Sequence, residues 1–161
     1  MTGKTHVMVG TAGLLALSIK MGTSIDLSGI NINPYIGMVT VGVGSTLPDI
    51  DIQQSHMGHK YKFISKHLTH RGITHTLLIP ALLTIIMWDF SFSVVLSSLV
   101  FGLLFGWVAH IAADMLNRKG VPILWPLLSQ KMHVMCIKTG KLSETIFCGV
   151  YLLVIGLWIL M

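Results

Sequence analysis

The sequence predicts an all-α membrane protein, folded as one domain over residues 1–161 into a compact bundle of about four to five transmembrane or re-entrant helices. Three observations predict this class. Hydrophobic residues make up 53% of the chain, only 11% of the residues are charged, and the mean hydropathy is +0.76. Soluble domains carry about 25% charged residues, so this composition disfavours a water-exposed globular protein and favours a membrane protein.

Five apolar segments follow one another along the chain. The fourth and fifth, at about residues 92–116 and 143–161, have the length that a helix needs to cross a bilayer. The first three, at about residues 5–20, 34–48 and 75–89, are shorter and carry polar residues at one end. We therefore expect these three either to span with their polar ends in a sheltered pocket or to be re-entrant.

Basic residues gather on one side of this arrangement. If all five segments cross, the N-terminus and the loops at 49–74 and 117–142 share one face. That face then carries every Lys and Arg of the chain except Lys20. Because basic loops stay in the cytoplasm, we expect a multi-pass membrane protein with this face cytoplasmic. The basic charge is thus explained by membrane orientation, and no nucleic-acid partner is expected.

Polar side chains that can bind a metal ion lie at the cytoplasmic ends of the first four segments. Because they come from four segments but share one depth, we expect them to meet in a single polar site at the cytoplasmic face. The predicted metal ligands are His6, Asp49, Asp51, His70, His75, His110 and Asp114.

His110 and Asp114 lie four residues apart in the fourth segment, GWVAHIAADML. On a helix this spacing places both side chains on one face. An imidazole and a carboxylate inside an apolar run are costly unless they are paired or bind a metal. The pair is therefore either half of a metal site or a hydrogen-bonded pair that staples the bundle.

The motif LPDID follows the second segment, where Pro48 can end a helix. Asp49 and Asp51 are two residues apart, and in a loop or an extended segment this spacing puts both on the same side. Carboxylates bind divalent cations and can bridge two of them. The alternative is a solvated helix end.

The motif HRGITH precedes the third segment and contains His70, Arg71, Gly72 and His75. Gly72 permits a sharp turn, and neutral imidazole is a common zinc ligand. Arg71, between two candidate ligands, suits a phosphate group or a ligating carboxylate. The alternative is that both histidines belong to a loop near lipid headgroups, which is our interpretation of the four remaining histidines: His56, His59, His67 and His133.

The ligand types favour a hydrolytic metal centre over other chemistry. Cys136 and Cys148 have no metal or redox spacing, and the chain contains no nucleotide-binding glycine loop. One or two divalent ions, zinc in preference to manganese or magnesium, would lower the pKa of a bound water and so supply hydroxide. The candidate catalytic residues are Asp49, Asp51, Arg71 and His75.

Four motifs in this order, THVMVG, LPDID, HRGITHT and HIAADMLNRKGVPILWP, resemble the YdjM-like, LexA-regulated, membrane-bound, metal-dependent hydrolases. The resemblance covers residues 5 to about 135. It implies a small inner-membrane protein with hydrolase activity, and it puts the family's polar motifs on the seven predicted ligands and Arg71. The LexA link implies expression during DNA damage.

These observations predict a membrane-embedded, metal-dependent hydrolase of the phosphoesterase or phospholipase type, acting on a lipid or lipid-linked substrate. The alternative is a metal-ion transporter or a non-catalytic metal-binding membrane protein, because intramembrane His and Asp also mark ion pathways. A conduit would, however, place ligands near the midplane and at the opposite face, where only Asp26 and Asp89 are expected. A third interpretation is a structural bundle fixed by a His–Asp network.

Overall fold

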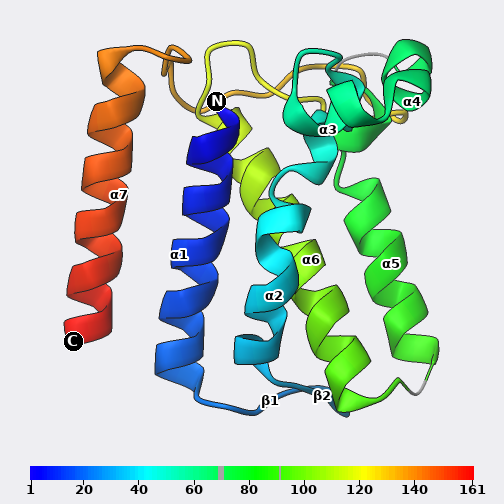
Figure 1. Cartoon of the computed structure of the whole chain (residues 1–161), viewed down its shortest axis with the longest axis vertical. Helices are drawn as coiled ribbons and strands as arrows, with labels where there is room; N and C mark the ends of the chain where they lie inside the picture. The colour runs from blue at the N-terminus through cyan, green and yellow to red at the C-terminus, as the bar shows by residue number, and fades with distance from the viewer. Residues whose placement is uncertain (69–70, 91) are drawn as a thin grey trace.

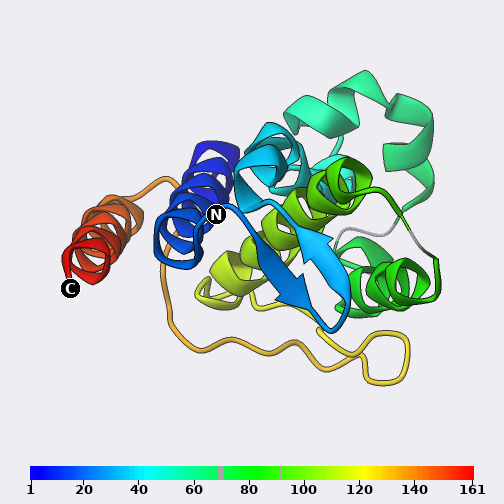
Figure 2. The same ribbon diagram turned by 90° about the horizontal axis from the view of Figure 1, so that it is seen from below.

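Helices of ten or more residues make up most of the structure, a computed structural model that describes residues 1–68, 71–90 and 92–161. Those within the described residues run side by side along one axis (Figures 1 and 2). They are α1 (Gly3–Met21), α2 (Pro34–Gly44), α5 (Leu78–Asp89), α6 (Val94–Met115) and α7 (Leu142–Leu160). Each falls on one of the five predicted apolar segments, so the mostly helical class is confirmed.

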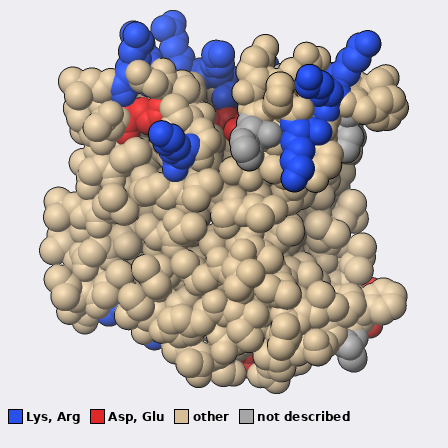
Figure 3. Space-filling view, in the orientation of Figure 1, with Lys and Arg blue, Asp and Glu red and all other residues tan. Residues whose placement is uncertain are grey.

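Short elements occupy the two ends of the bundle. The N-terminus lies at the same end as α3 (His56–Lys60) and α4 (Lys62–His67), which we call the α3–α4 end (Figure 1). Two 3₁₀ turns connect into these elements, η1 (Leu47–Asp51) and η2 (Ile73–His75). Lys and Arg side chains gather at the α3–α4 end, as Figure 3 shows for one face.

A small antiparallel hairpin lies at the opposite end, formed by β1 (Ile25–Leu27) and β2 (Ile30–Ile32). The sequence analysis did not predict it. Gly29 adopts φ 93°, which allows the tight turn, and its backbone N–H donates to Asp26 Oδ1 at 2.6 Å. The next helix, α2, then begins at Asn33, whose side-chain oxygen accepts from the N–H of Tyr35 at 3.0 Å.

The backbones of α2 and α6 are in direct contact because glycine lines their interface. A Cβ atom added at Gly102 would lie 2.0 Å from the Gly37 carbonyl oxygen, and one at Gly106 would lie 2.2 Å from that of Val41. Small residues permit this approach between helices in lipid. The close packing places the C-terminal end of α2 directly against the turn of α6 that contains His110 and Asp114.

Two helices, α6 and α7, are long and apolar enough to cross a bilayer, within the part of the chain that the structure describes. With 11 and 12 residues, α2 and α5 rise only about 16–18 Å, little more than half the hydrocarbon thickness. The structure therefore supports a helical membrane protein but not a particular number of spans. Glu144 is the one buried residue of α7, and the rest of the helix is exposed or half-buried, as expected for a helix in contact with lipid.

Candidate metal centre

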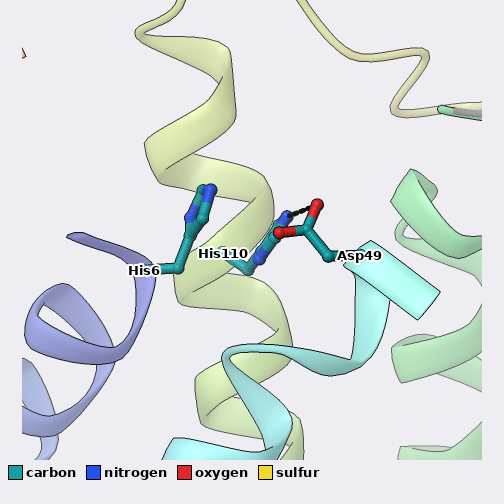
Figure 4. A group of neighbouring side chains, drawn as sticks. All are labelled: His6, Asp49 and His110. Carbon is teal, nitrogen blue, oxygen red and sulfur yellow. Dashed lines mark ion pairs between the residues drawn. The ribbon is translucent and has the colours of Figure 1, made fainter. Parts of the chain in front are cut away.

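Five of the seven predicted ligands lie together at the α3–α4 end. His6 comes from α1, Asp49 from η1, His75 from η2, and His110 and Asp114 from α6. The three imidazoles are completely buried, Asp114 is 2% exposed, and the Asp49 side chain keeps 14% of its surface accessible. Figure 4 shows His6, Asp49 and His110 pointing toward one another from three separate segments.

The donor atoms are spaced like the ligands of one small cation. His75 Nε2 lies 3.3 Å from His110 Nε2, 3.8 Å from Asp114 Oδ2 and 4.0 Å from Asp49 Oδ1. The distance from His110 Nε2 to Asp49 Oδ1 is 3.7 Å. Bonds of about 2.0–2.1 Å to zinc put tetrahedral donors about 3.3 Å apart. The four distances exceed this spacing by at most about 0.7 Å, so small movements would suit either of two groups of three donors, His6–Asp49–His110 or His75–His110–Asp114, to an ion.

His6 completes the cluster and has two buried nitrogens without hydrogen bonds among the described residues. Its ring stacks on His110 with a centroid separation of 3.6 Å. Its Nε2 lies 3.3 Å from Asp114 Oδ1, but not in hydrogen-bond geometry. Leaving a buried polar atom unpaired is costly. A cation bound by Nε2 would satisfy that nitrogen and so reduce this cost, which is why the residues fit a metal ion.

Outer contacts orient two of the imidazoles. His110 Nδ1 lies 2.7 Å from the carbonyl oxygen of Ser45. A carbonyl can only accept, so Nδ1 carries the proton and Nε2 presents a lone pair to the cluster. His75 Nδ1 lies 3.3 Å from Asp51 Oδ2 and 3.0 Å from Thr74 Oγ1. This contact likewise directs His75 Nε2 toward the cluster.

Asp49 and Asp51 do not point the same way, contrary to the expectation for an extended segment. They lie in η1, a 3₁₀ turn with three residues per turn, so residues two apart project in directions about 120° apart. Asp49 faces the Nε2 side of His75, and Asp51 Oδ2 faces the Nδ1 side. Asp51 Oδ2 also accepts from the Arg71 N–H and from Thr74 Oγ1, each at 2.8 Å. Its contacts are those of a carboxylate that orients a ligand.

Arg71 is buried and joins the centre to the 117–141 loop. Its Nη2 donates to Asp114 Oδ2 at 2.8 Å, and its Nη1 donates to the Gly120 carbonyl. The backbone is left-handed, with φ 59°, which is uncommon for a residue other than glycine. The contact with a carboxylate is one of the two interactions that the sequence suggested for Arg71, and it occupies one arm of the guanidinium.

Burial raises the pKa of the Asp49 carboxyl above its usual range, although His6 and His75 act in the opposite direction. The same desolvation makes the charged carboxylate a strong partner for a cation. Asp49 is also the most exposed of the five donors, so water and substrate would reach the centre on its side.

His70 falls outside the described residues. His59, His67 and His133 are exposed and are not part of the cluster. The loop prediction holds for His133 but was wrong for His59 and His67, which lie in the short helices α3 and α4. Sequence reasoning missed the carbonyls of Ser45 and Gly120, since a backbone carbonyl has no residue-type signal. It also missed Glu144, whose signal was a lone charge at the start of the fifth apolar segment.

Comparison with known proteins gives one family. The family model described as YdjM inner membrane protein matches residues 1–160, which include all four motifs behind the resemblance. The inner membrane protein YdjM of Escherichia coli (strain K12) is 35% identical over 113 residues, which are 63% of this chain and 56% of that protein. The same figures hold for YdjM of Shigella flexneri.

A more extensive match is the uncharacterized protein YvsG of Bacillus subtilis (strain 168). It is 30% identical over 148 residues, covering 89% of this chain and 85% of that protein. No solved structure matches this chain.

Proposed function

The chain belongs to the YdjM inner membrane protein family, and from this premise we propose that it is a membrane-embedded, metal-dependent hydrolase. It would cleave a phosphoester in a lipid or lipid-linked substrate. The observation that carries the proposal is the buried cluster of three imidazoles and two carboxylates, in which neither nitrogen of His6 has a hydrogen-bond partner in the described part of the chain. Intramembrane groups of this kind mark functional sites.

Zinc is the ion that this donor set favours, with manganese or magnesium as alternatives. Imidazole nitrogen suits zinc, whereas magnesium prefers oxygen ligands. Two overlapping groups of three could be formed, His6–Asp49–His110 and His75–His110–Asp114. His110 belongs to both, and its Nδ1 is committed to Ser45. Its single available lone pair can bind one ion, which favours one metal over two.

The side chains have separable tasks in this mechanism. A bound zinc ion would supply hydroxide by lowering the pKa of its water. Asp49, at the exposed edge of the cluster, would take the proton of the attacking water. Asp51 holds His75 in one tautomer. Arg71 holds Asp114, and its positive charge would favour a phosphate group beside the centre.

An apolar cavity supports a lipid substrate. Its volume is about 460 Å³, and it lies between the β1–β2 hairpin, α5 and α6. Phe101, Leu104 and Val108 line it from the side of α6 that faces away from α2. A hydrocarbon chain in this cavity would reach Val108, only about 3 Å of helical rise from the level of His110. Chain and reacting headgroup would then lie at successive depths of the bilayer.

We also propose that the α3–α4 end faces the cytoplasm and that the chain crosses the membrane several times. The gathering of basic side chains at this end (Figure 3) supports that orientation. A multi-pass arrangement is supported by the parallel course of the long helices beside α6 (Figure 1). The centre would then meet the headgroups of the cytoplasmic leaflet.

Elemental analysis of the purified protein in detergent tests this proposal. We expect about one zinc ion per chain, retained by His133→Ala, an exposed histidine outside the cluster, and lost by His110→Ala and Asp49→Ala. Phospholipids and lipid phosphates in vesicles are then screened for phosphate release. Absence of metal, even after zinc or manganese is added, would refute the metal centre. Stoichiometric metal without hydrolysis would favour the metal-binding or transport alternative.

A further inference from the structure

Glu144 is a buried carboxylate that the proposed mechanism does not use. It lies in the first turn of α7 and is 4% exposed. It is also the only buried residue of that helix. A carboxylate in a segment that could span a membrane is costly unless its oxygens find donors. Its contacts therefore indicate what the burial achieves.

The side-chain hydrogen bonds of Glu144 connect the first turn of α1 to the loop before α7. Oε1 accepts from the backbone N–H of Thr2 at 2.7 Å and from Thr5 Oγ1 at 2.6 Å. Oε2 accepts from the Gly140 N–H at 2.6 Å. The carboxylate thus ties the loop before α7 to the first turn of α1, where Thr2 is itself the N-cap residue.

That first turn carries His6, the ligand with the fewest restraints of its own. Neither of its ring nitrogens makes a hydrogen bond among the described residues. Ring stacking on His110 gives contact but does not fix the ring by directed bonds. The place of His6 therefore depends on the backbone around it, which the Met1 amine ties to Asp114 and which Glu144 Oε1 holds through Thr2 and Thr5.

We propose that Glu144 is a positioning residue of the metal centre, acting through Thr2 and Thr5 on His6. The inference rests on the proposed metal site but concerns a residue that touches none of its donors. It gives α7 a role beyond membrane anchoring, because this helix supplies an anchor for the first turn of α1.

The chemistry requires a carboxylate rather than an amide. Glu144 accepts on both oxygens, from donors on two different segments. Glutamine would present an NH₂ group to one of these donors, so one side of the connection would break. Glu144→Gln is therefore a nearly isosteric change that removes the link, and Thr5→Val removes one link from the other end.

Two controls separate this role from general docking of α7. Ser143→Ala alters the neighbouring residue, whose hydroxyl accepts from the Lys138 N–H at 3.1 Å and does not contact α1. Tyr151→Phe removes a different polar contact of α7 with α1, in which Tyr151 Oη donates to the Val9 carbonyl at 2.9 Å. Neither change touches Thr2 or Thr5.

Zinc affinity is measured for all variants by competition with a chelator. We expect Glu144→Gln and Thr5→Val each to weaken binding about tenfold, in the range of supporting contacts around metal ligands. The double variant should lose little more than either single variant, since both remove one connection. Ser143→Ala and Tyr151→Phe should bind zinc as the unchanged chain does.

A second readout does not depend on metal. Metal-free protein is treated with diethyl pyrocarbonate, and modification of His6 is quantified by mass spectrometry. His6 is completely buried, so we expect protection in the unchanged chain and both controls, and modification in Glu144→Gln and Thr5→Val. If His6 becomes reactive only in Glu144→Gln and Thr5→Val, while the unchanged chain never binds metal, the positioning role is upheld and the metal centre is refuted. Unchanged His6 reactivity and zinc affinity in both variants would overturn the positioning role alone.

Discussion

The Nδ1 atom of His110 lies 2.7 Å from the carbonyl oxygen of Ser45, the C-cap residue of α2. This contact joins the packing of two helices to the orientation of a ligand. Ser45 can approach because Gly106, one turn before His110, has no side chain: a Cβ there would lie 2.6 Å from the Ser45 nitrogen. The geometry of the metal centre therefore depends on close contact between α2 and α6.

Gly106→Ala should damage both stability and metal binding. The added methyl group would lie 2.2 Å from the Val41 carbonyl oxygen, so α2 must move away from α6. We expect a loss of about 1–3 kcal/mol in the free energy of unfolding, together with weaker zinc binding. Thermal unfolding and chelator competition measure these effects. Gly149→Ala in α7, where nothing lies within 4 Å of the new methyl group, is the matched control.

Asp51→Asn should weaken the centre without abolishing it. Asparagine keeps the shape of the side chain but removes the charge that faces His75 Nδ1. Supporting groups of this kind contribute about 10- to 100-fold to metal affinity. We expect that loss for Asp51→Asn, whereas Asp49→Ala should bind no stoichiometric zinc. Equal loss in the two variants would instead make Asp51 a direct ligand.

Arg71→Lys should release the 117–141 loop although the charge is kept. A lysine ammonium cannot reproduce the two separate contacts of the guanidinium, with Asp114 Oδ2 and the Gly120 carbonyl. A buried acceptor left without its donor costs about 1–3 kcal/mol. We expect faster proteolysis of the loop by trypsin in detergent. Lys131→Arg, an exposed change within the same loop, serves as the control for altered cleavage sites.

The five long helices could be predicted because each coincides with a sustained apolar segment. Their ends could not be placed as well. The second segment was expected to continue to about residue 48, but α2 ends at Gly44 and a 3₁₀ turn follows. The hairpin escaped prediction because three-residue strands give almost no periodic signal. It depends on tertiary contact, for example that of the Asn33 N–H with Ser98 Oγ at 2.8 Å.

The candidate site could be predicted as far as topology allows. A common depth in the membrane predicted that five residues would meet, and the structure brings them together. They are His6, Asp49, His75, His110 and Asp114. The different directions of Asp49 and Asp51 could not be foreseen, because they depend on whether residues 47–51 are extended or coiled. The role of Glu144 depends on hydrogen bonds between opposite ends of the chain, which no local pattern encodes.

Filling the apolar cavity should impair the use of long-chain lipids. Thr84 is exposed and lines the cavity from α5, whereas its neighbour Ile85 is exposed and does not line it. Thr84→Phe would place a ring in the space available to a hydrocarbon chain, so we expect KM for a dipalmitoyl lipid phosphate to rise about tenfold, equivalent to about 1.4 kcal/mol. Hydrolysis of the dihexanoyl homologue should change little, because a short chain needs less of the cavity.

Ile85→Phe adds an aromatic ring to the same helix outside the cavity and should leave the hydrolysis of both substrates unaffected. An equal change of both substrates in Thr84→Phe would show that the cavity does not hold the chain.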